Sequence, residues 1–168
     1  MKVILYMAIT ANGYIAKKNN DTPWSSEEFA SYFSHVRSAK HVIVGHKTFK
    51  LFRASDFADM GHPLVIILTR KSSLSDKDQV KYVNSPQQAL QVLEAKGFMQ
   101  ALVTGGGETN QAFLDQGLID EIYLDVEPIL FGQDIPLFAP TVYDCQLELL
   151  GTLKLNPHTL QLNYKVLK

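Results

Sequence analysis

The sequence has almost no cysteine and no long apolar run, and both shortages narrow what the protein can be. Its single cysteine, Cys145, has no partner for an internal disulfide, which fits a reducing compartment. The His and Cys residues do not have the spacing of a zinc site, so we expect no metal. Apolar runs fall short of the roughly 18 residues needed to span a bilayer, and the apolar start has no cleavage site typical of a signal peptide. We therefore expect a cytoplasmic protein with no membrane partner.

An excess of charge of either sign is also missing. Lys and Arg number 16 against 17 Asp and Glu, which gives a formal net charge of −1. Aromatic residues are not interleaved with a basic stripe, so we expect no nucleic acid as a partner. The five histidines are scattered without the order of a hydrolase triad. What remains is a globular composition of 168 residues, 46% of them hydrophobic, which predicts one domain over residues 1–168.

Short apolar runs alternate with helical patterns from one end of the chain to the other. Strands are predicted over 3–9, 41–45, 63–69, 79–83, 101–104 and 119–128, with an antiparallel hairpin over 147–155 and 160–167. Helices are predicted from 25 or 26 to 38, over 46–52, over 86–97 and after 107. In the first helix, Phe29, Tyr32, Phe33 and Val36 share one apolar face. This order is typical of an α/β domain.

The strongest local signal is the segment ALVTGGGETNQAFL (101–114). Three glycines stand between a buried strand and a helix, where the backbone can approach a ligand and the helix offers free N–H groups to an anion. A phosphate-bearing cofactor is typical of such a turn, although the spacing differs from the six-residue dinucleotide fingerprint. A tight packing turn is the alternative that this segment alone leaves open.

Two further strand ends carry positive charge. HVIVGHKTF (41–49) places His46, Lys47 and Thr48 at a helix start, and Arg70 and Lys71 follow the strand over 63–69. Taken singly, each is explained as well by a solvated helix cap or an exposed loop. Because ligands bind outside the carboxyl ends of strands in α/β sheets, three such ends together favour a phosphate site.

The segment around Trp24 offers a candidate for acid–base chemistry. Trp24 follows a loop over 10–23 of the kind that can cover a pocket. Glu27 and Glu28 come next, in the first turn of the predicted helix, where a carboxylate also suits the helix dipole. A carboxylate beside an apolar wall is suited to hold or protonate a nitrogen heterocycle.

Six segments follow one another in this order: YMAITANGYIA, PWSSEEF, HVIVGHKTF, VIILTR, VTGGGETNQAFL and IDEIYLDVEPILFGQDIPLF. Together they resemble the dihydrofolate reductase superfamily over nearly the whole chain. The stretch over 105–138 is most similar to the reductase domain of the bifunctional riboflavin-biosynthesis deaminase–reductase and its stand-alone relatives. The resemblance implies a dihydrofolate-reductase-like fold, with a mostly parallel twisted sheet flanked by helices. It implies NADPH as hydride donor and a pterin-like or aminopyrimidine-like heterocycle as substrate. The enzyme would be of the dihydrofolate reductase or 5-amino-6-(5-phosphoribosylamino)uracil reductase type.

The resemblance also implies roles for particular residues. Trp24, Glu27 or Glu28, and Thr104 would face the substrate and the nicotinamide. The cofactor positions would be Ala8, Ile15 and Ala16 at the nicotinamide, Gly45, His46, Lys47, Thr48, Thr69 and Arg70 on the adenosine side, and Gly105, Gly106, Gly107 and Glu108 beside the pyrophosphate. Similar proteins pair through the sheet and the C-terminal hairpin, so we expect a homodimer.

Two positions depart from the family pattern. Asn12 stands where riboflavin-type proteins carry aspartate, which puts a pyrimidine substrate in question. His46 stands where a basic residue is usual, which leaves Lys47 or Arg70 to bind the 2′-phosphate and leaves NADH open as the coenzyme.

The acidic position of dihydrofolate reductases falls on Phe29 in an ungapped alignment and on Glu28 after a shift of one residue. The alternatives to the riboflavin-type reductase are a true dihydrofolate reductase and a non-catalytic NADP-binding protein.

Overall fold

The structure is a computed structural model that describes residues 1–71, 75–77 and 79–168. Its strands are β1 (Lys2–Thr10), β2 (Tyr14–Ala16), β3 (His41–Gly45), β4 (Leu64–Leu68), β5 (Val80–Val83), β6 (Gln100–Val103), β7 (Glu121–Glu127), β8 (Ile135–Pro136), β9 (Leu147–Lys154) and β10 (Leu160–Val166). Its helices are α1 (Ser26–Ala39), α2 (His46–Phe49), α3 (Ala54–Asp59), α4 (Pro86–Ala95) and α5 (Gly107–Leu114).

One eight-stranded sheet organises the molecule, in the order β5-β4-β3-β6-β1-β7-β10-β9. The strands from β5 to β7 are parallel, and β10 and β9 continue the sheet as an antiparallel hairpin. The predicted fold class is therefore confirmed. A second, two-stranded sheet joins β2 to β8 and so ties the loop after β1 to the loop after β7.

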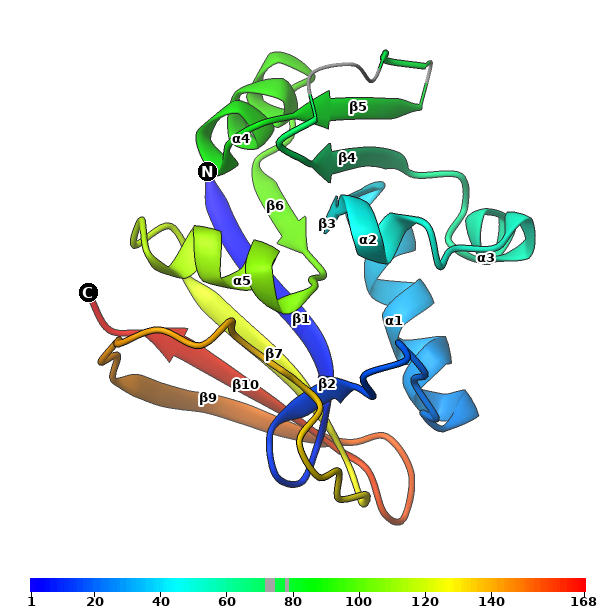
Figure 1. The fold of residues 1–168 in the computed structure, drawn as a ribbon, viewed down its shortest axis with the longest axis vertical. Coiled ribbons are helices and arrows are strands. Elements are labelled where there is room, and N and C mark those ends of the chain that lie inside the picture. The colour runs from blue at the N-terminus through cyan, green and yellow to red at the C-terminus, as the bar shows by residue number, and fades with distance from the viewer. Residues whose placement is uncertain (72–74, 78) are drawn as a thin grey trace.

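Helices cover both faces of the sheet (Figure 1). On one face, α4 and α5 pack through Ala89, Leu93 and Phe113 onto the alternate residues of β1, β3, β4 and β6. On the other face, α1 and the segment around α3 pack through Val36, Ala39 and Met60. Because the central parallel strands are buried on both sides, they are nearly continuous apolar runs. Within the described residues, no helix combines the length and the hydropathy that crossing a membrane requires.

The differences from the predicted elements are local. The helix predicted over 46–52 ends at Phe49, and the short elements β2, α3 and β8 were not predicted. The face predicted for α1 was wrong in its first turn, since Phe29 is 39% exposed whereas Glu28 is 3% exposed. Ser25 is the N-cap, because its Oγ accepts a hydrogen bond from the Glu28 N–H at 3.2 Å. That cap sets the rotation of the helix, which turns Glu28 inward.

Candidate active site

The predicted turns after β3 and β6 lie side by side at the carboxyl edge of the sheet. The Gly45 N–H donates to the Gly105 carbonyl at 2.7 Å, and the Thr104 N–H donates to the Ile43 carbonyl at 3.0 Å. These bonds continue the parallel β3–β6 pairing beyond Val103, the last residue of β6. They bring the helix start at His46 next to the glycine turn, as the sequence predicts.

The glycines at this edge are required partly by the protein's own packing. An ideal Cβ on Gly45 would lie 2.6 Å from Thr109 Oγ1, and one on Gly107 would lie 2.8 Å from the Pro136 carbonyl oxygen. Gly105 has φ +97°, which disfavours other residues, and its peptide bond to Gly106 is cis. Gly106 is the least enclosed of the three, and a Cβ there would lie 3.2 Å from Thr48 Oγ1. The packing alternative therefore explains Gly45, Gly105 and Gly107, and Gly106 is the position left to face a ligand.

Two polar atoms at the same edge are buried without a partner in the described part of the chain. They are Thr104 Oγ1 and His46 Nδ1. Burial, with Lys50 and Lys71 close by, lowers the pKa of His46, so the ring is neutral at pH 7. Orphaned buried groups are unusual in folded proteins and suggest an external partner.

The other predicted cofactor residues surround this turn. Lys47 and Glu108 are exposed and form an ion pair at 3.2 Å across it. The Thr69 N–H donates to the Val83 carbonyl at 2.9 Å. Arg70 is exposed. Together with Thr48 beside Gly106, the adenosine-side residues lie along one edge of the sheet.

Ala8, Ile15 and Ala16 are buried where the end of β1 meets β2. The Cδ1 atom of Ile15 would lie 3.9 Å from a Cβ on Gly106, so β2 borders the glycine turn. The segment that begins with β8 packs against the loop between β1 and β2, since the Leu137 N–H donates to the Gly13 carbonyl at 3.2 Å. Asn110 Nδ2 holds the same segment by donating to the Leu137 carbonyl at 2.7 Å.

Glu28 is the chemically distinctive residue of this region. The residue is only 3% exposed, between α1 and the sheet, and its carboxyl group accepts no hydrogen bond from the residues that the structure describes. Burial raises its pKa to about 8, and the nearby charges of Asp125 and Glu127 act in the same direction. Glu27, the other candidate, is exposed and bonds the neighbouring Ser26 hydroxyl at 3.0 Å. The structure therefore separates the two candidates and brings only Glu28 inside.

Asp125 and Glu127, which the sequence analysis did not single out, lie with Glu28. We call these three residues the acidic cluster. Asp125 lies opposite Ala8 and Glu127 opposite Thr10, so both point to the α1 face of the sheet. Asp125 accepts hydrogen bonds from the Tyr6 hydroxyl and from Gln161 Nε2 at 2.8 Å, and burial raises its pKa. Glu127 accepts from Ser25 Oγ at 2.7 Å and Thr159 Oγ1 at 3.2 Å.

Aromatic rings cover the start of α1. Trp24 stacks on Phe131 with ring centroids 5.8 Å apart and planes 18° apart. Asn12 fixes Phe131 through its main chain, because Nδ2 donates to the Phe131 carbonyl at 2.7 Å and Oδ1 accepts from its N–H at 3.2 Å. An aspartate at residue 12 could not make the first bond while ionised. Asn12 therefore orders the loop, whichever substrate the site takes.

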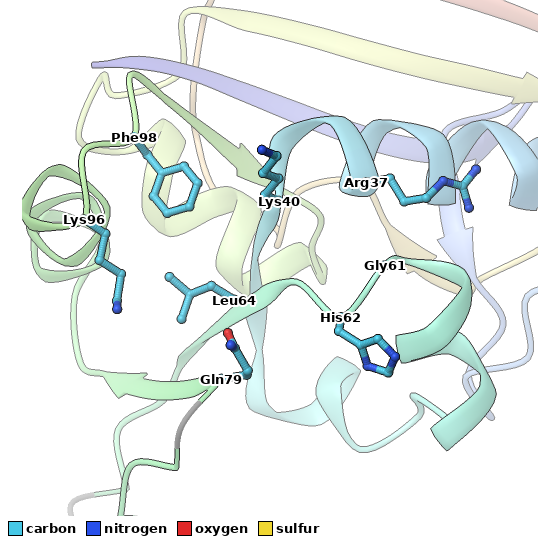
Figure 2. A pocket seen from close by; sticks show the side chains of 8 residues that line it. All are labelled: Arg37, Lys40, Gly61, His62, Leu64, Gln79, Lys96 and Phe98. Atoms are coloured by element: carbon cyan, nitrogen blue, oxygen red, sulfur yellow. The ribbon is translucent and has the colours of Figure 1, made fainter.

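A shallow hollow exists at the opposite edge of the sheet, near the amino ends of β3, β4 and β6. It is lined by Arg37, Lys40, Gly61, His62, Leu64, Gln79, Lys96 and Phe98 (Figure 2). The charged ends of Arg37, Lys40 and Lys96 point in different directions, and none of the predicted site residues lies there. Ligands of α/β sheets bind at the carboxyl ends, so the candidate active site is the edge with Gly106 and Glu28.

The fold is a mostly parallel α/β sheet whose candidate site lies at the carboxyl ends of its strands. The family model of the RibD C-terminal domain matches residues 1–160, so the chain belongs to that family.

Similar proteins agree with this assignment. YwjB of Bacillus subtilis (strain 168) is 26% identical over 171 residues, which cover 97% of each chain. The crystal structure of a riboflavin biosynthesis protein from Shewanella sp. PV-4 has the same fold, with a TM-score of 0.77, 23% identity and full coverage of both chains. A Thermotoga maritima diaminohydroxyphosphoribosylaminopyrimidine deaminase/5-amino-6-(5-phosphoribosylamino)uracil reductase is similar in fold at a TM-score of 0.74 and 16% identity. The match covers 98% of this chain and 56% of the Thermotoga chain.

Proposed function

We propose that the protein is an NADPH-dependent reductase that transfers hydride to a C=N or C=O bond of a pterin-like or aminopyrimidine-like heterocycle. The observation that carries the proposal is Glu28, a buried carboxyl group with a raised pKa and no partner, beside the end of β1. Perturbed, buried acids that open on a ligand edge are typical of catalytic sites. The RibD C-terminal domain family supports a reductase over a binding scaffold.

The residues at the carboxyl edge of the sheet, around the glycine turn, fit a dinucleotide phosphate. Thr104 Oγ1 and His46 Nδ1 are buried polar atoms without a partner, and Gly106 leaves its backbone accessible. Lys47, Lys71 and Arg70 supply positive charge close to the same turn, of the kind that a 2′-phosphate needs. Because His46 is neutral, we assign the choice of NADPH over NADH to Lys47 and Arg70.

Glu28 is the proton donor in this mechanism. With a pKa of about 8, its carboxyl group keeps its proton at pH 7 and can give it to a ring nitrogen of the substrate. NADPH, when bound, would supply the hydride for the carbon of the C=N bond, and the π electron pair of that bond would become the lone pair of the nitrogen that Glu28 protonates. Thr104 orients the ring, and the Trp24–Phe131 stack excludes water.

A fluorescence titration with NADPH tests the cofactor, because Trp24 is the single tryptophan. We expect saturable quenching or energy transfer in the micromolar range. Gly106→Val should weaken binding about tenfold, which corresponds to about 1.4 kcal/mol. Gly151→Val is the matched control, since a Cβ at Gly151 meets no atom within 4 Å; because Gly151 lies in β9, the variants are compared in the same oligomeric state, checked by sedimentation. If neither NADPH nor NADH binds, the reductase proposal is wrong.

We propose further that the chain forms a homodimer through β9. This strand is the outer edge of the sheet, and Leu147, Leu149, Leu150 and Leu153 are 40–55% exposed along it. A long apolar edge strand invites pairing with another chain. Sedimentation should show a dimer, and Leu149→Lys with Leu153→Lys should yield a monomer. A monomeric unmodified protein would contradict the proposal.

A further inference from the structure

The two halves of the candidate active site carry opposite charge. In the cofactor half, residues 45–53, 69–71 and 105–108 contain five basic residues against one acidic residue, Glu108; the basic ones are Lys47, Lys50, Arg53, Arg70 and Lys71. In the substrate half, residues 24–36 and 122–140 contain no Lys or Arg and hold all three members of the acidic cluster. The first half suits the phosphates of a dinucleotide, and the second repels phosphate.

The negative charge of the substrate half is not cancelled by ion pairs. Asp125 is fully buried, its donors are the neutral Tyr6 and Gln161, and His35 is near enough to oppose the rise of the Asp125 pKa without forming a salt bridge. Glu127 is 3% exposed, and its donors are the neutral Ser25 and Thr159. No salt bridge within the described ranges includes a member of the acidic cluster. Buried charge that no salt bridge offsets acts on an incoming ligand.

Two lysines follow β2, and each has an acidic residue beside it. Lys17 forms an ion pair with Asp21 at 3.1 Å, and its Nζ lies 5.8 Å from the centroid of the Phe131 ring. The backbone N–H of Lys18 donates to Asp134 Oδ1 at 2.9 Å. The charge of Lys17 is therefore offset by Asp21, and Asp134 adds a negative charge beside Lys18.

We propose that the substrate half takes a nitrogen heterocycle that carries no phosphate group and can accept a proton, and that the acidic cluster selects it. The Thermotoga maritima enzyme, by contrast, is named for a phosphoribosylamino substrate. The proposal rests on the proposed function for the identity of the site, and it defines the substrate class of that site.

Proton transfer accounts for the preference for a basic ring. The proton leaves the Glu28 carboxyl oxygen and forms an N–H bond on the ring nitrogen, which converts the pair into a carboxylate and a cationic ring. Asp125 and Glu127 stabilise that cation by charge, because both lie close enough to Glu28 to raise its pKa. A phosphate on the same ligand would be repelled by the charge of these buried carboxylates and would lose affinity.

The test compares 2,4-diamino-6-(hydroxymethyl)pyrimidine with its phosphate monoester by calorimetric titration into the 168-residue protein. We expect the alcohol to bind at least about tenfold more tightly than the ester. Glu127→Gln keeps the hydrogen-bond acceptor and removes the charge, so it should narrow the difference. Glu28→Gln should weaken the alcohol about tenfold, whereas the control Glu27→Gln should change it less than about twofold, since Glu27 is exposed.

Three results would overturn the proposal. They are equal or tighter binding of the ester, no binding of either compound, and equal effects of Glu28→Gln and Glu27→Gln. A preference for the ester that disappears in Lys17→Ala would place the phosphate at Lys17 and would equally overturn it. The NADPH titration on the same samples tests the proposed function separately, because the cofactor half does not include the acidic cluster.

Discussion

The two ends of α1 hold two buried titratable side chains with opposite surroundings. Glu28 lies in the first turn, and its carboxyl group has no donor among the described residues. His41 follows the last turn and is fully buried, but both ring nitrogens are used. Its Nδ1 donates to the Ala39 carbonyl at 2.7 Å, and its Nε2 accepts from the Leu102 N–H at 3.1 Å. A satisfied buried group holds the fold together, whereas an unsatisfied one is available to a ligand.

The largest effect that would sharpen this comparison is on catalysis. Glu28→Gln removes the proton donor with little change in shape, so kcat on a reducible heterocycle should fall about 10²–10³-fold. The NADPH dissociation constant should not change, because Glu28 lies outside the cofactor half. Steady-state kinetics beside Glu27→Gln measure this. Full activity of Glu28→Gln would remove Glu28 from the mechanism.

At the other end of α1, the expected effect is on stability alone. His41→Ala leaves the Leu102 N–H and the Ala39 carbonyl without their side-chain partner and opens a cavity, which should cost about 3 kcal/mol of unfolding free energy. Urea denaturation measures the loss. NADPH binding per folded molecule should stay within about twofold. A His41→Ala protein as stable as the wild type would show that the bridge contributes nothing.

The pH dependence of stability should differ in sign between the two residues. Glu28 has a folded pKa of about 8 against 4.5, so its contribution is complete below pH 4.5 and is lost as pH rises toward 8. Burial lowers the pKa of His41 from 6.5 to about 4, so its contribution is present above pH 6.5 and is lost as pH falls toward 4.

Glu28→Gln should therefore be more stable than the wild type at pH 8, by roughly 2 kcal/mol or more, and nearly equal to it at pH 5. Urea unfolding at the two pH values checks this. The same difference at both pH values would show that Glu28 is ionised in the folded protein over the whole range.

The sequence predicted the sheet and the glycine turn well but missed two of the three members of the acidic cluster, Asp125 and Glu127. Strand periodicity and Gly105–Gly107 are local signals, and the structure places them as expected. Asp125 and Glu127 alternate along β7 as solvent-facing charges do, and only the packing of α1 buries that face. The signal that could have found them is a pair of acidic residues at i and i+2 in a strand that neighbours a buried strand, because such residues lie on the same face of the sheet.

The rotation of α1 shows the same limit. Phe29 fits an apolar face by spacing, yet the Ser25 cap and the contact of Ser25 with Glu127 turn Glu28 inward. His41 was one of five scattered histidines in the sequence, and its role depends on the Leu102 N–H, 61 residues away. Contacts between distant segments decided both cases, and local pattern does not encode them.

The smallest predicted effect concerns the exposed ion pair of the cofactor half. Lys47→Ala breaks a pair with Glu108 in which both side chains are largely exposed, so stability should change by less than about 0.5 kcal/mol. NADPH binding should weaken about tenfold while NADH binding stays constant, since only NADPH carries the 2′-phosphate. Parallel fluorescence titrations with both coenzymes measure this. Equal losses for the two would assign Lys47 to another phosphate.

The central claim is that Glu28 is a buried acid that keeps its proton at neutral pH, and a carbon-13 NMR titration of labelled glutamate carboxyl groups tests it most directly. Comparison with Glu28→Gln identifies the Glu28 signal. We predict a midpoint near pH 8, shifted downward in Asp125→Asn because one neighbouring charge is removed. A Glu28 midpoint near 4.5 would contradict the claim and leave the site without its proton donor.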